Sequence, residues 1–288
     1  MIRRALRAVL LALAAPAVAQ EAAQQAAPTE TPDAVPEDVR VLFEALRLPE
    51  IVDVISSEGQ EDAEALAQTM FQAAPPPSTW TDMVADIYDP EHLEAELLVS
   101  LSEELEGVDT APMIAFFENE PGRTLIAREV ETRVALSDEE AEEAAREAAA
   151  VAAADRSSRF DLLTRYVEAL DLIEYNVVGS LNSNYAYVSG LLDGGALGGN
   201  MTESDVLSDL WMQEPQIRAD TSEWVMAFLL SAYEPVPDAD IEALIAFSET
   251  EPGQVLNRAI FGAFDERFSE ISRALGLVAA RYMTTEEL

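Results

Sequence analysis

The sequence predicts an all-α fold made of two tandem, related multi-helix units joined by a long Ala/Glu-rich helix. Three observations support this prediction. Hydrophobic residues recur at helical spacing, residues 114–122 (IAFFENEPG) nearly recur at 245–253 (IAFSETEPG), and alanine and glutamate dominate the stretch between the two copies. The brief alternation at 184–188 is the strongest strand-like pattern, and we assign it to a helix end.

The first 19 residues have the three parts of a cleavable secretory signal. Arg3, Arg4 and Arg7 form a basic start, an apolar run follows, and Ala17-Val18-Ala19 supplies the small residues that precede cleavage. The apolar run is shorter than the roughly 20 residues that span a bilayer. We therefore expect export to the periplasm, or secretion, without membrane insertion after signal cleavage. General secretion is favoured over the twin-arginine route because the usual residues around the arginine pair are missing.

Residues 20–37 are expected to form a flexible acidic tether, because prolines recur there and almost no large aliphatic side chain is present. Helical unit 1 is predicted over 38–136. Within it Leu93, Leu97, Leu101 and Leu105 follow the helical period on one stripe.

Residues 137–159 are predicted to form the Ala/Glu-rich connecting helix. Ser137 and Glu140 have the spacing of a capping box, and alanine fills the middle of the segment. We expect this helix to run on towards Phe160. It would act as a spacer or pack across both units.

Helical unit 2 is predicted over 160–283, followed by a C-terminal tail at 284–288. In its clearest helical stripe, apolar residues recur on one face of the helix over six turns. The stripe consists of Leu256, Ile260, Phe264, Phe268, Ile271, Leu275 and Val278.

The repeat extends beyond the nine-residue motif. At the same offset of 131 positions, Leu125 pairs with Leu256 and Leu97 with Phe228, and eight of the twelve positions from 114 to 125 are identical. Upstream, residues 45–56 resemble 169–180 at an offset of 124, which the glycine-rich residues 193–200 can accommodate as an insertion. Two copies of one ancestral helical unit explain this pattern.

The Glu-Pro-Gly triplet of each copy is expected to be a structural turn. Proline forces the preceding residue out of the helical region, and glycine lets the backbone pass close to a packed neighbour. Each triplet should therefore form a rigid corner between antiparallel helices. The residues of the turn motif are Phe116, Pro121, Gly122, Phe247, Pro252 and Gly253.

The charge of the chain excludes several classes of partner. Seventeen basic residues, all arginine, stand against 55 acidic ones, and removal of Arg3, Arg4 and Arg7 leaves 14 against 55, a net charge of −41. Such a surface repels nucleic acid. With no lysine and no cysteine, the chain has no Schiff-base lysine, phosphate-loop lysine or disulfide.

No catalytic residue, metal ligand or cofactor is predicted. His92 is the only histidine, so a zinc site lacks its nitrogen and sulfur ligands. The serine-nucleophile, phosphate-loop and EF-hand patterns are missing too. The acids beside the corners, Glu118 with Glu120 and Glu249 with Glu251, are expected to be solvated. The alternative is that they serve a carboxylate-dependent hydrolase of cell-wall material, because two acids suffice for that reaction.

Aromatic residues gather in unit 2 and provide the candidate binding site. Tyr185, Tyr187, Trp211, Trp224 and Phe228 could line an apolar groove, although a helical stripe of aromatics is more often core. The leading hypothesis is a non-enzymatic protein that binds an unknown protein or a small apolar ligand. A divalent-cation buffer is a third, weaker hypothesis.

The chain also resembles a family. The segments LRLPEIVDVISSEG, WMQEPQIRADTSEW and SAYEPVPDADIEALIAFSETEPGQVLNRAIFGAFDERFSEISRALG are similar to an uncharacterised bacterial periplasmic family, the domain-of-unknown-function family 2059. The similarity is strongest from Thr202 to Gly276, and it includes the spacing of Phe247, Gly253 and Leu256. The resemblance implies export and a helical fold, and it assigns no catalytic residue.

Overall fold

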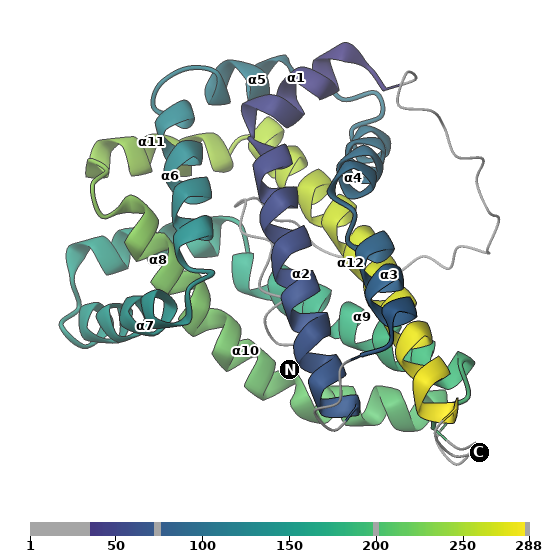
Figure 1. Ribbon diagram of the computed structural model, residues 1–288. Helices are drawn as coiled ribbons and strands as arrows, with labels where there is room; N and C mark the ends of the chain where they lie inside the picture. Colours follow the sequence, from purple (N-terminus) through teal and green to yellow (C-terminus); the bar gives the residue numbers. More distant parts are fainter. Residues whose placement is uncertain (1–34, 72–75, 198–201, 286–288) are drawn as a thin grey trace.

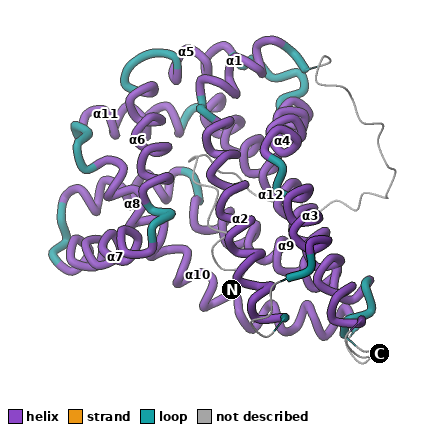
Figure 2. Tube along the Cα trace, viewed as in Figure 1, coloured by secondary structure: helices purple, strands orange, loops and turns teal. Residues whose placement is uncertain are grey.

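The computed structural model of the protein describes residues 35–71, 76–197 and 202–285. Every regular element in these ranges is a helix, which confirms the all-α prediction (Figures 1 and 2). The helices are α1 (Glu37–Ala45), α2 (Leu48–Met70), α3 (Ser78–Ile87), α4 (Pro90–Glu104), α5 (Ala111–Phe117), α6 (Gly122–Ala135), α7 (Glu139–Ala154), α8 (Ser158–Ala169), α9 (Leu172–Asp193), α10 (Glu203–Tyr233), α11 (Asp238–Ser248) and α12 (Glu251–Thr285). The predicted signal, nearly all of the tether, residues 198–200 of the glycine-rich stretch and the end of the tail lie outside the described residues.

The helices before α7 (α1–α6, the first series) and those after it (α8–α12, the second series) make matching contacts. Helix α1 packs on α5 as α8 packs on α11, and α2 packs on α4 and α6 as α9 packs on α10 and α12. The last helix of each series also crosses to the other, because α6 packs on α10 and α12 packs on α4 (Figure 1). The two series therefore share a single interior.

Both series turn from the first helix into the second through one left-handed residue. Arg47 has φ 53° between α1 and α2, and Asp171 has φ 48° between α8 and α9. The leucine that follows each of them, Leu48 or Leu172, is buried. A non-glycine residue pays about 1–2 kcal/mol in this conformation. Burial of the adjacent leucine offsets that cost.

The two Glu-Pro-Gly triplets form close corners at the starts of α6 and α12. A Cβ atom added to Gly122 would lie 2.3 Å from the carbonyl oxygen of Phe116, and one added to Gly253 would lie 2.3 Å from that of Phe247. Glycine is needed at both corners because no side chain fits. The prolines differ, since Pro121 precedes α6 after a cis peptide bond whereas Pro252 lies within the first turn of α12.

The expected continuation of the connecting helix towards Phe160 is wrong. Helix α7 ends at Ala154, Arg156 takes a left-handed φ of 48°, and α8 begins at Ser158. The hydroxyl of Ser157 accepts a hydrogen bond from the Phe160 amide, so it caps a new helix instead of extending the old one.

The predicted capping box at the start of this helix is also wrong. Asp138 is the N-cap, and its carboxylate accepts from the Ala141 amide at 2.9 Å. The Ser137 hydroxyl instead donates to Glu58 of α2 at 2.6 Å. Helix α7 packs along α10, and together with α8 it lies on the left side of the molecule in Figure 1.

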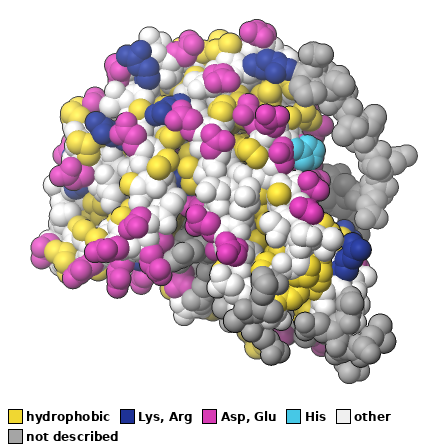
Figure 3. Space-filling view, in the orientation of Figure 1, with side chains coloured by type: hydrophobic (Ala, Val, Ile, Leu, Met, Phe, Trp, Pro, Cys, Tyr) yellow, Lys and Arg dark blue, Asp and Glu magenta, His cyan; other side chains and the backbone are white. Residues whose placement is uncertain are grey.

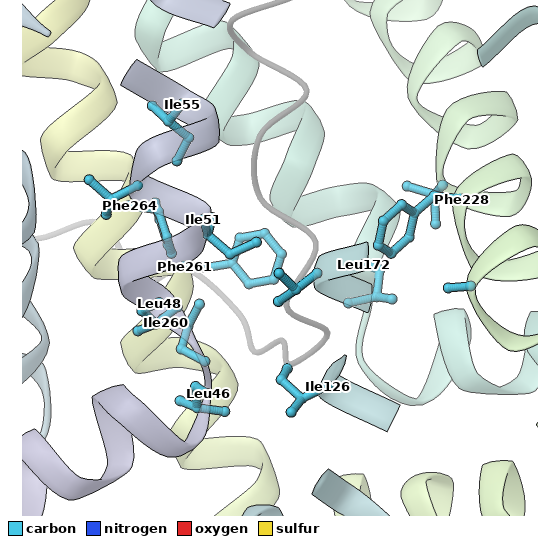
Figure 4. Close-up of a cluster of buried hydrophobic side chains, with 14 of the residues drawn as sticks. Leu46, Leu48, Ile51, Ile55, Ile126, Leu172, Phe228, Ile260, Phe261 and Phe264 are labelled. Carbon is cyan, nitrogen blue, oxygen red and sulfur yellow. The ribbon is translucent and has the colours of Figure 1, made fainter. Parts of the chain in front are cut away.

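The hydrophobic core is continuous from α1 to α12. Figure 4 shows side chains of α2, α6, α9, α10 and α12 that belong to this one cluster. The sequence stripes predict part of this core correctly, because Leu93, Leu97 and Leu101 of α4 and Leu105 at its end are all buried.

Candidate functional site

The structure does not bring the five candidate aromatic residues into one groove. Trp224 is 4% exposed and Phe228 1% exposed, and their rings stack in the core with centroids 5.4 Å apart. Trp211 lies on the same helix but is 68% exposed. Tyr187 is half-buried where α9 and α12 touch, and Tyr185 lines a separate surface cleft.

Trp224 also supports a charged group inside the protein. The Arg133 guanidinium lies 5.9 Å from the centre of the Trp224 ring, a distance typical of a cation–π contact. The same guanidinium donates to both carboxylate oxygens of Glu58, one of them at 2.7 Å. Because the side chain of Arg133 is only 5% exposed, this pair ties α6 to α2 beneath the surface.

A surface cleft of about 640 Å³ lies between α9, α12 and the first turn of α10. It is lined by Asn182, Tyr185, Ala186, Ser189, Leu192, Asp193, Glu203, Ser269, Glu270 and Arg273. Three carboxylates, two serine hydroxyls, an amide, a phenol and a guanidinium stand among apolar carbon atoms on its wall. The cleft is suited to a polar or cationic group.

The polar groups of the cleft are held in place by contacts with one another. The Tyr185 hydroxyl donates to Glu203 at 2.5 Å, and Arg273 donates to Asp193 at 2.5 Å. The Arg273 charge is thereby balanced inside the cleft. Burial raises the pKa of Glu270. The Arg267 guanidinium, 2.7 Å away, acts in the opposite direction and lowers this pKa. The cleft keeps more negative than positive charge.

The second candidate surface is the outward side of the first half of α10. Leu207 is 42% exposed, Trp211 68% and Met212 71%, and Pro215 is exposed as well. We name these four residues the α10 face. Large apolar side chains grouped on a surface commonly mark an interaction site.

The sequence contains the signal that separates Trp211 from the core. Val206 and Leu210, four residues apart, define the buried side of α10. Trp211 and Met212 fall one and two positions later, so they are rotated by about 100° and 200° from Leu210. The α10 face could have been found in this way, whereas the cleft depends on the packing of three helices.

The acids beside the corners are in solvent. Glu118, Glu120, Glu249 and Glu251 are all exposed. Hydrogen bonds from Thr124 and Arg123 lower the pKa of Glu120, so this carboxyl gives up its proton more readily than usual and is poorly suited to be a general acid.

The groups that could support metal or histidine chemistry are sparse. His92 is exposed, and its Nε2 lies 3.2 Å from Glu96. In the part of the chain that the structure describes, no three His, Asp or Glu side chains are grouped as metal ligands.

One buried carboxyl stands apart from the surface sites. Glu129 of α6 is 5% exposed and accepts a hydrogen bond from the Tyr233 hydroxyl. Burial raises the pKa of Glu129 to about 8, while the bond from Tyr233 acts in the opposite direction. Tyr166 packs against Tyr233 with ring centroids 6.3 Å apart. This cluster lies where α6, α8 and α10 meet.

Comparison with protein-family models, with curated proteins and with solved structures gives no match. The resemblance to the periplasmic family therefore stays a prediction. Among the helices of the described ranges, none is long and apolar enough to cross a membrane.

Proposed function

We propose that this is an exported, non-enzymatic helical protein that binds another protein through the α10 face. The observation that carries the proposal is the exposure of Trp211 and Met212 side by side on one helix, at 68% and 71%. Tryptophan is enriched among the residues that dominate binding energy at protein interfaces, and methionine adapts to varied partners.

A protein partner is favoured over a small apolar ligand. The aromatic rings that could surround such a ligand, Trp224 and Phe228, pack against each other in the core. The exposed apolar side chains instead form a convex helical surface, which suits the groove or flat face of a partner.

Export is part of the proposal. It is supported by the basic, apolar and small-residue order of residues 1–19. The partner should accordingly be a protein of the periplasm or of the exterior.

We further propose that α1–α6 and α8–α12 descend from one duplicated helical unit. The support is the matching positions of Arg47 and Asp171, the equal approach of Gly122 and Gly253 to a phenylalanine carbonyl, and the matching helix contacts. Among the described residues of α1–α6, no group of exposed large apolar side chains corresponds to the α10 face. We infer that binding was acquired by the second copy.

A photo-crosslinking experiment in living cells tests the binding proposal. A photo-reactive amino acid is incorporated at Ser208, which is exposed between Leu207 and Trp211, and at the exposed Ala144 of α7 as a control. We expect an adduct of one discrete mass from position 208 and none from 144. The double change Trp211→Ser and Met212→Ser should lower its yield about tenfold, the scale of a binding hot spot.

Two outcomes would overturn this proposal. One is the absence of an adduct specific to position 208. The other is an adduct of twice the mass of the chain, which would indicate self-association instead of a different partner.

A further inference from the structure

We propose that the α10 face and the cleft form one continuous surface for a basic segment of the partner protein. An arginine or lysine of that segment enters the cleft, while its apolar residues cover Leu207 and Trp211. This inference rests on the proposed function, because it specifies the chemistry of the partner that the α10 face binds.

The two parts of the surface are joined along one line of α10. Glu203 lines the cleft, and Leu207 and Trp211 follow at intervals of four residues, so the three side chains lie one above the other on the helix. Helical rise places successive members of this line about 6 Å apart. An extended or helical segment can therefore contact the cleft and the tryptophan together.

The charge of this surface selects a cation. Asp193, Glu203 and Glu270 line the cleft, and the only cation among its lining residues, Arg273, is paired with Asp193. Asp209 adds another exposed carboxylate three residues before Met212, close to it on the helix surface. Glu270 is paired with Arg267 at 2.7 Å, whereas Glu203 accepts only from the neutral Tyr185 hydroxyl among the contacts described above. A guanidinium or ammonium group of the partner can therefore pair with Glu203, and an anion would be repelled.

The same charge argues against a second copy of the chain. Two copies that met through the α10 face would bring Glu203 and Asp209 of one near those of the other, and each chain has a net charge of −38. Acidic side chains are also spread over the face of the molecule in Figure 3, including the lower left edge where α7 lies in Figure 1. A partner with positive charge avoids this repulsion.

The test uses the Ser208 cross-link with charge-neutralising variants of the full chain. The double change Glu203→Gln and Asp209→Asn removes one carboxylate from the first turn of α10 and one further along. The matched control, Glu140→Gln and Glu143→Gln, does the same on α7, where both residues are exposed. We expect the α10 variant to lower the adduct yield about fivefold and the control to change it less than about twofold.

Salt dependence gives a second measurement on the partner once the adduct identifies it. Binding of the purified partner to the natural chain should weaken as sodium chloride rises, and the Glu203→Gln and Asp209→Asn variant should show a smaller salt dependence. Circular dichroism and thermal melting establish that both variants are folded.

The outcomes separate the two proposals. If no adduct forms at position 208 in the natural chain, the proposed function fails and this inference fails with it. If the adduct forms but the α10 and α7 variants reduce it equally, or the cross-linked segment lacks arginine and lysine, the partner is bound without charge selection. That result would overturn this inference alone.

Discussion

The ring of Phe116 stacks face to face on the ring of Phe247, with centroids 4.2 Å apart and planes inclined by 8°. These two residues hold the same position in the two copies of the nine-residue motif, 131 positions apart in the chain. Phe117 meets the Phe247 ring edge-on at 5.6 Å. The two Glu-Pro-Gly corners therefore meet through their aromatic side chains.

Removal of either stacked ring should destabilise the protein. We expect Phe116→Ala and Phe247→Ala each to lower the free energy of unfolding by about 1–3 kcal/mol, less than for a fully buried phenylalanine because both are half-buried. A double-mutant cycle measured by urea denaturation should give a coupling of about 0.5–1.5 kcal/mol. Trp211→Ala, at an exposed aromatic, is the control and should change stability by less than about 0.5 kcal/mol. Additive effects of the two phenylalanine changes would contradict the stacking.

The glycines of the corners should not tolerate a methyl group. Gly122→Ala and Gly253→Ala would each place Cβ 2.3 Å from a backbone carbonyl oxygen, so we expect a loss of about 1–3 kcal/mol in unfolding free energy. Gly179→Ala on α9 is the matched control, because its Cβ would lie 3.6 Å from the nearest atom, a carboxylate oxygen of Asp265. Alanine should favour that helix by up to about 1 kcal/mol. Equal melting temperatures for all three variants would refute the crowding argument.

Stability should depend on pH through Glu129. Burial raises its pKa in the folded protein to about 8 from a usual value of 4.5, so the folded state keeps a proton that the unfolded chain releases. Between these values, raising the pH favours unfolding by up to about 1.4 kcal/mol per pH unit, and the effect ends once the folded form also ionises.

The variant Glu129→Gln isolates this effect. Its amide cannot ionise, so its urea midpoint should fall less than that of the natural chain between pH 5 and pH 8. The natural chain and the variant should differ little at pH 5, and the variant should be the more stable at pH 8. Parallel pH profiles for the two proteins would show that Glu129 ionises as freely in the folded state as in the unfolded one.

The buried ion pair between α6 and α2 should be sensitive to loss of its cation. Arg133→Met leaves Glu58 without its main partner and removes the cation from the Trp224 ring, so we expect about 2–4 kcal/mol of destabilisation. Arg123→Met breaks an ion pair with Glu120 in which both side chains are more than half exposed. It should cost less than about 1 kcal/mol by thermal or urea unfolding. Similar losses in both variants would mean that burial does not strengthen the Arg133 pair.

The helices could be predicted from the sequence because the apolar residues follow the helical period over many turns. The helix ends were harder to predict. Arg47 and Asp171 are left-handed although neither is glycine or asparagine, and the hydrophobic spacing from Leu163 through Leu170 to Ile173 continues across the break. Tertiary packing of the adjacent leucines decides those turns, and no local pattern reveals it.

The candidate site was predictable only in part. Trp211 and Trp224 lie on one helix, and the helical period separates them, because Trp224 falls about 40° from the buried Leu210 and Trp211 about 100° from it. The cleft depends on α9 and α12 lying together, so Asn182 and Arg273 carry no signal of their own in the sequence.

Helix α6 of the first series packs on α10 of the second, and α12 of the second packs on α4 of the first. This arrangement determines what a break in the backbone would do. Cutting the backbone at Arg156, between α7 and α8, would leave two polypeptides that each cover part of the other's interior. Neither piece could bury its own apolar side chains in isolation. The two pieces should therefore remain bound to each other after the cut and dissociate only as they unfold. Produced separately, they should become ordered only when mixed.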